Sequence, residues 1–184
     1  TEKPGSYGRL IAGFKHLQEM GQTLTANACM NEFSYRSAPD YVGLVKSHGF
    51  KQLHLDIIRP SDAGERSDQH LRSIMSRYSD MAPYFRDMLE GFDALDPNYD
   101  VNLGNFPFCL LPAWSHKIHH DGRATATVSA DGDGLSGEWN KYEDKKFDKV
   151  HPPACESCVF RPRCSGVFTK YLEFYGADEF EPVT

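Results

Sequence analysis

The sequence predicts an α/β protein built in two parts. Three observations support this prediction: strands alternate with helices over the first half, the helical periodicity ends near Leu95, and cysteines, prolines and glycines become denser beyond it. Alternating strands and helices are typical of βαβ units, which form a parallel sheet with right-handed crossovers. We therefore expect residues 1–95 and 96–184 to be the two parts, divided at about residue 96.

Five elements are expected in the first part. Apolar residues recur at helical spacing after Ser6 and stop at Gly21, and two further helical patterns follow capping serines. The expected helices cover 6–20, 37–48 and a long stretch beginning after residue 67, and the expected strands cover 23–30 and 52–58. Pro83 should kink or split the long helix. Cys29 alternates along its strand, and we expect it in the core.

The second part is expected to be irregular. Residues 123–130 alternate as a strand, and the Asp-Gly-Asp-Gly sequence at 131–134 is a strong turn signal, so we expect a small hairpin there. The charged segment 141–149 should be a solvated face, and residues 165–175 should form a closing helix. His116, His119 and His120 are expected on a solvated loop.

Composition excludes several classes of protein. The 184 residues are 40% apolar and 12% aromatic, which is enough for a packed core. Twenty Lys and Arg against 26 Asp and Glu give a charge of -6, so nucleic-acid binding is not expected. The densest apolar stretch, 106–114, is short and contains two prolines, so no membrane span is expected either. With no signal segment in view we expect a cytoplasmic protein, and a start at Thr1 suggests a piece of a longer one.

The cysteines carry the clearest chemical signal. Cys155, Cys158 and Cys164 stand within ten residues, and three thiols so close in a reducing compartment favour a metal or cluster site over disulfides. Cys109 is the natural fourth ligand. From spacing alone, zinc and an iron–sulfur cluster compete on even terms, and His151 could replace Cys109 in a zinc site of three cysteines and one histidine.

The tail resembles that of radical S-adenosylmethionine (SAM) proteins that have a SPASM or twitch-like extension. The resemblance rests on Cys155-x2-Cys158-x5-Cys164-x-Gly166, on Tyr171 and on the Gly-Ala-Asp-Glu-Phe-Glu-Pro run at 176–182. Gly5-Ser6-Tyr7, the run 26–31 and the run 57–61 stand in the order found in the later part of that family's partial (β/α)6 barrel. The resemblance therefore covers nearly the whole chain.

The resemblance implies a fold and a set of ligands. Residues 1–95 would be the C-terminal portion of a partial (β/α)6 radical SAM barrel, and residues 96–184 a small cysteine-rich α+β domain. Four cysteines would bind one auxiliary [4Fe–4S] cluster there: Cys109, Cys155, Cys158 and Cys164. Four candidates suit the shorter, twitch-like arrangement with a single cluster. Asn27 and Arg59, near the ends of their strands, would contact SAM.

The chain departs from the family in one important way. The Cys-x3-Cys-x2-Cys motif that holds the SAM-cleaving cluster and the Gly-Gly-Glu segment that helps to bind SAM are absent. The chain alone is therefore not expected to cleave SAM. Its expected partners are the missing N-terminal half of the barrel, a small-molecule or peptide substrate and an electron-donor protein. Two alternatives remain open: a zinc-stabilised binding or scaffold module, and a catalytically inactive partner protein.

Overall fold

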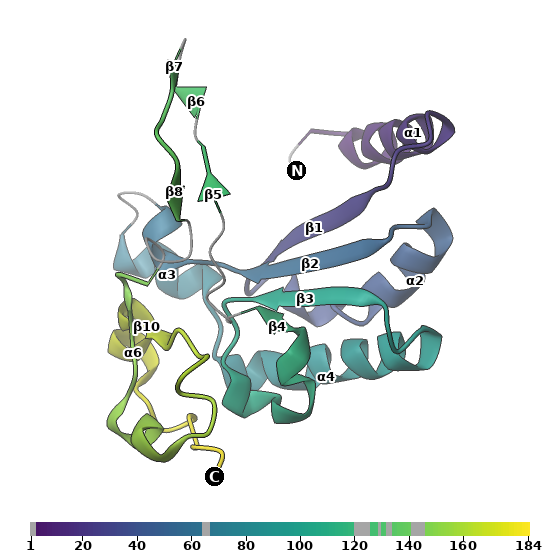
Figure 1. The fold of residues 1–184 in the computed structure, drawn as a ribbon. Helices are drawn as coiled ribbons and strands as arrows, with labels where there is room; N and C mark the ends of the chain where they lie inside the picture. The colour runs from purple at the N-terminus through teal and green to yellow at the C-terminus, as the bar shows by residue number, and fades with distance from the viewer. Residues whose placement is uncertain (1–2, 64–66, 120–125, 129, 132–133, 141–145) are drawn as a thin grey trace.

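The centre of the protein is a four-stranded parallel sheet (Figure 1). Its strands, in spatial order, are β1 (Thr25–Met30), β2 (Gln52–Ile57), β3 (Asp100–Gly104) and β4 (Ile118–His119). The computed structural model describes residues 3–63, 67–119, 126–128, 130–131, 134–140 and 146–184. The expected parallel sheet of alternating strands and helices is confirmed, as a mixed α/β fold.

Helices connect the strands. The α-helices are α1 (Ser6–Glu19), α2 (Asp40–His48), α3 (Asp68–Ile74), α4 (Tyr78–Leu95) and α6 (Thr169–Tyr175). Short 3-10 segments are η1 (Tyr35–Ser37), η2 (Pro60–Ala63), η3 (Phe108–Leu110), η4 (Pro112–Lys117) and η5 (Pro153–Ser157). Ser67 caps α3 by accepting a hydrogen bond from the amide of His70 (3.3 Å), as its position predicted.

The long helical pattern after Ser67 is interrupted, but not at Pro83. The backbone is extended at Met75 and Arg77, which separates α3 from α4, while Pro83 lies inside α4. Pro83 therefore does not split the helix, and the expected split there is wrong. Ser76, between the two extended residues, is buried and donates a hydrogen bond to the carboxylate of Glu32 (2.5 Å), a tertiary contact that holds the connection.

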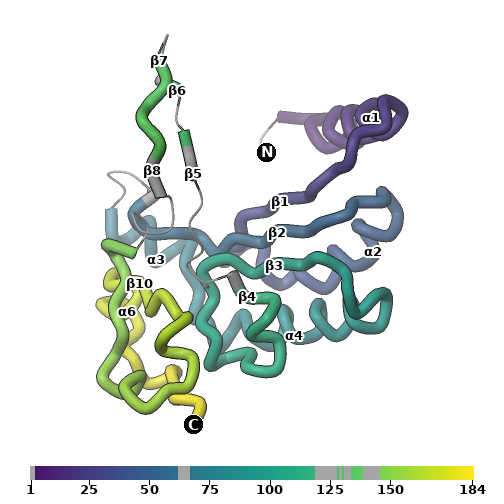
Figure 2. Tube along the Cα trace, in the orientation of Figure 1, coloured from purple at the N-terminus to yellow at the C-terminus, as the bar shows by residue number. Residues whose placement is uncertain are grey.

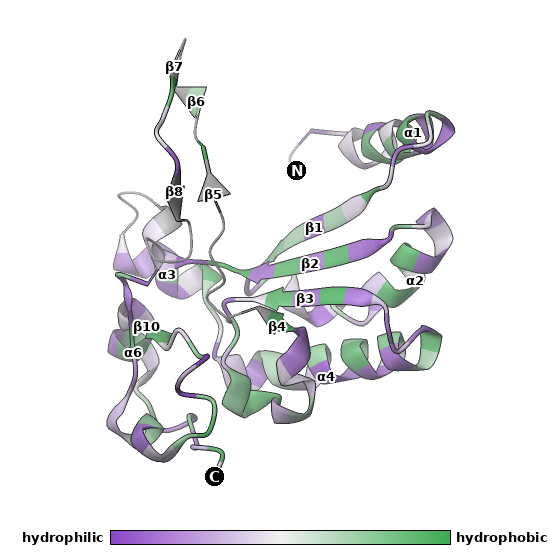
Figure 3. Cartoon of the chain, in the orientation of Figure 1, coloured by the Kyte–Doolittle hydropathy of each residue, from purple (hydrophilic) through white to green (hydrophobic). Residues whose placement is uncertain are grey.

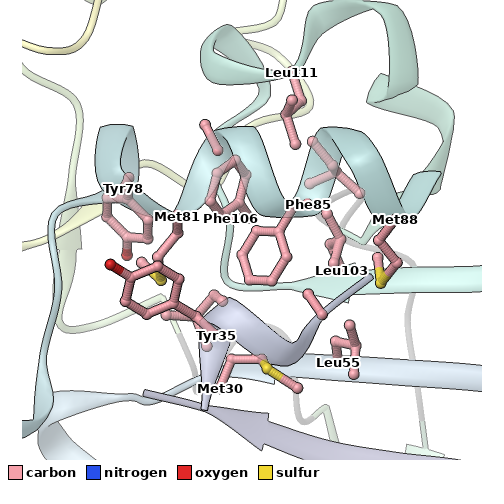
Figure 4. Close-up of a cluster of buried hydrophobic side chains, with 14 of the residues drawn as sticks. Met30, Tyr35, Leu55, Tyr78, Met81, Phe85, Met88, Leu103, Phe106 and Leu111 are labelled. Atoms are coloured by element: carbon pink, nitrogen blue, oxygen red, sulfur yellow. The ribbon is translucent and has the colours of Figure 1, made fainter. Parts of the chain in front are cut away.

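The main core lies between the sheet and α4. Figure 4 shows Met81, Phe85 and Met88 of α4 directed toward Leu55 and Leu103 of the strands. All five side chains are at most 1% exposed. Burial of this size stabilises a fold by about 1.5–3 kcal/mol per side chain, so the apolar stripe of α4 fixes the helix on one face of the sheet. The stripe is core packing, as its spacing predicted.

The opposite face of the sheet is polar, and its residues on β1 and β2 are exposed or half-buried. Side chains alternate between the two faces, and the register places the following residues together on the polar face: Thr25, Asn27, Cys29, Gln52, His54, Asp56, Asp100 and Asn102. Figure 3 shows the alternation of polar and apolar residues along β2. Cys29 is exposed, so its expected place in the core is wrong: the strand alternates, but this side of it is the uncovered one.

The sheet continues beyond the change in composition. β3 and β4, which the sequence did not suggest, extend it to His119, so the expected division near residue 96 does not coincide with its end. The expected hairpin is present: β5 (Ala126–Thr127) pairs with β8 (Trp139–Asn140), and β6 (Ala130–Asp131) pairs with β7 (Gly134–Leu135). Its turn residues 132–133 lie outside the described residues.

The C-terminal tail packs at the carboxyl ends of the strands. In Figure 2 the tail lies beside that end of the sheet, next to α3 and the start of α4. β9 (Lys149–Val150) and β10 (Val167–Phe168) form an antiparallel ribbon that closes the cysteine-rich loop between them. Tyr78 and Tyr171 pack with ring centroids 4.4 Å apart, and both are almost fully buried. None of the described helices has the length and apolar character needed to cross a membrane.

Candidate metal centre

Four of the five cysteines line one pocket. Cys109 comes from η3, between strands β3 and β4 of the parallel sheet, whereas Cys155, Cys158 and Cys164 come from the loop between β9 and β10. Each of the four is partly buried and none forms a disulfide. The fold therefore brings together the four cysteines that the sequence grouped, although Cys109 is distant from the others along the chain.

Tight turns present the three tail cysteines. The amide of Cys155 donates to the carbonyl of Pro152 (2.9 Å), and the amide of Cys158 donates to the carbonyl of Cys155 (3.2 Å). The amide of Cys164 then donates to the carbonyl of Phe160 (2.8 Å). Successive turns of this kind reverse the backbone over a few residues, so that one loop can direct three sulfurs toward the same pocket.

Aromatic packing joins the Cys109 segment to the tail. Phe108 stacks on Phe160 with ring centroids 5.2 Å apart and planes 18° apart. The guanidinium of Arg163 lies 5.5 Å from the centroid of the Phe108 ring. The backbone of Phe108 also forms a hydrogen bond with the thiol of Cys164. These contacts fix the fourth cysteine beside the other three.

Gly166 shapes the loop beside Cys164. Its φ of 88° lies in the left-handed region, and a Cβ at this position would come within 2.5 Å of the carbonyl oxygen of Val150. The amide of Gly166 donates to the sulfur of Cys164 (3.4 Å). Only glycine fits this place, and its amide stabilises a thiolate on Cys164.

Burial and mutual proximity disfavour free thiolates in the pocket. Burial raises the pKa of the Cys109 thiol to about 12, and its three neighbouring cysteines add to the effect. Burial also raises the pKa of Cys155 and of Cys164. A positively charged group bound between them would reverse this preference, because thiolates are the form that binds metals.

Lys149 places a positive charge beside Cys164. Its charge lowers the pKa of that thiol, although burial remains the larger effect. Its Nζ donates to Asn105 Oδ1 (3.0 Å) and to Ser165 Oγ (3.1 Å). The expected solvated face at 141–149 is therefore wrong for Lys149, which is half-buried; residues 141–145 lie outside the described residues. Sequence reasoning missed Lys149 because it stands in a run of alternating charges.

His151 lies at the same pocket but is already engaged. It lines the pocket together with the four cysteines, and its Nε2 donates to the carbonyl oxygen of Cys164 at 2.9 Å. Within the described part of the chain, no group of three or more His, Cys, Asp or Glu side chains is placed to hold a metal ion. His116 is exposed on η4, whereas His119 ends strand β4, so the expected loop is wrong for His119; His120 lies outside the described residues.

Asn27 is exposed in the structure, whereas Arg59 is buried in an ion pair. Asn27 is exposed on the polar face of the sheet, in the middle of β1 and opposite His54. Arg59 is only 6% exposed, and its guanidinium donates to both carboxylate oxygens of Asp148 at 3.1 and 2.9 Å. These two residues do not lie at the cysteine pocket, whose lining includes neither.

Comparison with protein-family models, with curated proteins and with solved structures finds no match to this chain.

Proposed function

We propose that this chain is the C-terminal part of a radical SAM enzyme and that Cys109, Cys155, Cys158 and Cys164 bind one auxiliary [4Fe–4S] cluster. The observation that supports this most strongly is the shared pocket of four cysteines from two distant segments. Four cysteine thiolates are the ligand set of such a cluster. The motif that binds the SAM-cleaving cluster would lie outside this chain.

A cluster is proposed over zinc because the cysteine spacing resembles that of radical SAM tails. A zinc ion binds thiolates at about 2.3 Å, which brings four sulfurs to within roughly 4 Å of one another. A [4Fe–4S] cluster holds its four thiolates further apart, around a larger body.

The polar face of the sheet supports the barrel part of the proposal. Parallel sheets are normally covered on both faces, yet here the face that bears Asn27, His54 and Asp56 is polar. In a (β/α) barrel the helices cover the outside and the inner faces of the strands look toward the interior. The polar face would be that inner face, where SAM and a small-molecule or peptide substrate would bind once the N-terminal half is present.

The residues of this chain would orient and insulate the metal group. When bound, an auxiliary cluster supplies an electron acceptor or a site that orients substrate. Phe108 and Phe160 would cover one side of it, the amide of Gly166 would donate to a ligand sulfur, and the tail would hold it at the carboxyl ends of the strands. In (β/α) barrels the chemistry gathers at those ends. The four pocket cysteines form no disulfide, which suits the reducing cytoplasm, where an electron-donor protein could reach the cluster.

Iron and sulfide content tests the proposal. The chain is purified without oxygen, reconstituted with ferrous iron and sulfide, and then analysed for iron, sulfide and zinc and by electron paramagnetic resonance after reduction. We expect about four iron and four sulfide atoms per chain. Cys109→Ser should lose most of the iron, whereas Cys29→Ser, which removes the fifth cysteine on the polar sheet face, should retain it.

Two other results would contradict the proposal. One zinc atom per chain with no sulfide would favour the zinc-stabilised module, and the His151→Ala variant would then show whether histidine is a ligand. Loss of iron from Cys29→Ser to the same extent as from Cys109→Ser would show that the pocket is not the binding site.

A further inference from the structure

The half-buried Lys149 is held in one position by contacts from three directions. Its ammonium group donates to Asn105 Oδ1 and Ser165 Oγ, and it lies 4.6 Å from the ring centroid of Phe168, its partner across the β9–β10 ribbon. A lysine side chain loses considerable conformational freedom when it is fixed in this way. The chain therefore holds a positive charge at a defined place against Ser165, the residue that follows Cys164.

Asn105 has an unusual backbone conformation that serves this arrangement. Its φ of 61° makes it the only residue other than glycine with a positive φ among those the structure describes. Asparagine tolerates this left-handed conformation better than most residues. Its Nδ2 donates to the carbonyl of Ile57 at the end of β2 (3.2 Å), which turns its Oδ1 toward Lys149. The end of the sheet thus positions the cation.

Charge beside the ligands controls the properties of an iron–sulfur cluster. Its reduction potential depends on net charge, on hydrogen bonds to the sulfurs and on exposure to solvent. Four thiolates give the oxidised cluster a negative total charge, and reduction adds one more. A fixed cation stabilises the reduced form more than the oxidised form. Arg161 also lines the pocket, but it is exposed, where water and salt screen its charge.

We propose that Lys149 is a positioning residue of the metal centre, whose fixed ammonium group raises the reduction potential of the bound cluster. This inference rests on the proposed function, because it requires that the four cysteines hold a redox-active group. In the reaction concerned, the oxidised cluster gains one electron from an external reductant. No bond to Lys149 forms or breaks.

A redox titration of the reconstituted full chain tests the inference. The midpoint potential is followed by electron paramagnetic resonance, with dithionite as the reductant and mediator dyes. Lys149→Met should lower the equilibrium constant for reduction about tenfold, which for one electron is about 59 mV toward negative potential. Lys149→Arg, which keeps the charge, should restore most of that shift. Lys51→Met, at the opposite end of β2, should leave the potential unchanged.

A second variant tests the charge of Lys149 by changing Asn105, its hydrogen-bond partner. Asn105→Asp leaves Lys149 in place and sets a carboxylate beside it, so it should also lower the potential. This variant decides the matter if Lys149→Met fails to fold or to retain iron. Suppose that the unmodified chain binds iron but neither variant shifts the midpoint potential more than Lys51→Met does. That result would overturn the role of Lys149 and leave the proposed function standing.

Two further outcomes are informative. If the midpoint potential of Lys149→Arg shifts as far as that of Lys149→Met, the effect is due to packing, and the role of the charge is overturned. An unmodified chain that binds zinc and no iron would overturn both this inference and the proposed function, so the two failures are distinguishable.

Discussion

Arg59 and Asp148 form a bidentate ion pair that connects the end of β2 to the segment before the cysteine loop. The two nitrogen–oxygen distances are 3.1 and 2.9 Å, and the Arg59 side chain is 6% exposed. The pair joins residues far apart in the sequence. It therefore holds β9, and with it the loop that bears three cysteines, near the end of β2.

Asp148→Asn should destabilise the protein strongly. Removing one partner of a buried pair leaves the other charge uncompensated, so we expect a loss of about 3 kcal/mol in the free energy of unfolding. Urea denaturation measures this. Asp87→Asn, on the exposed side of α4, is the control and should change stability by less than about 0.5 kcal/mol. Equal effects in the two variants would mean that the pair does not stabilise the tail.

The Arg59–Asp148 pair also predicts that the free energy of unfolding depends on pH. Burial by itself would raise the pKa of Asp148, but hydrogen bonds from Arg59 and Ser61 outweigh it and hold this pKa below its usual value. The stabilisation is therefore complete above about pH 4, the unfolded value, and is lost as the pH falls through the folded value. We expect the stability difference between the unmodified protein and Asp148→Asn to narrow below about pH 4. A constant difference down to pH 2 would contradict this.

Tyr171→Phe should weaken the start of α4. The hydroxyl of Tyr171 accepts a hydrogen bond from the amide of Tyr78 (2.9 Å) and donates to the carboxylate of Glu179, which in turn accepts from the amide of Ser79 (2.9 Å). The tail thus satisfies two of the helix amides that lack partners within α4. We expect a loss of about 1–2 kcal/mol by thermal unfolding. Tyr7→Phe, at an exposed position, should be neutral.

Gly166→Ala should disturb the cysteine loop. The added Cβ would meet the carbonyl oxygen of Val150 at 2.5 Å, and the φ of 88° is unfavourable for alanine. We expect lower stability and iron content reduced at least twofold after reconstitution. Gly137→Ala, where a Cβ would have nothing within 4 Å, should match the unmodified protein. Full iron content in Gly166→Ala would show that the loop can adjust.

Gly104→Ala should clash on the polar face of the sheet. A Cβ there would lie 1.9 Å from the Asp56 carboxylate, which leans over the glycine from the neighbouring strand. We expect a loss of about 1–3 kcal/mol in unfolding free energy, a typical cost of overpacking. Combining it with Asp56→Ala should recover most of that loss, and a double-mutant cycle measures the coupling. Additive effects would rule out the clash as the cause.

Several elements were predictable from local patterns. The helical spacing of α1 and α2 and the alternation of β1 and β2 gave their positions closely, because each repeats a pattern set by its own geometry. β3 was missed because its polar Asp100 and Asn102 give a weak strand signal. It is a strand because β2 lies beside it. Cys29 was misplaced because alternation gives two faces without saying which one is covered.

The sequence by itself determined the local turns: the spacing of Cys155, Cys158 and Cys164 requires one loop to present three sulfurs. Only the tertiary structure decided that Cys109 joins them and that Lys149 stands beside them. The physical reason is the difference in sequence separation between the two kinds of contact. Turns depend on neighbours a few residues away, whereas the meeting of these segments depends on aromatic stacking, a buried ion pair and an edge of the sheet, which exist only once the whole chain has folded.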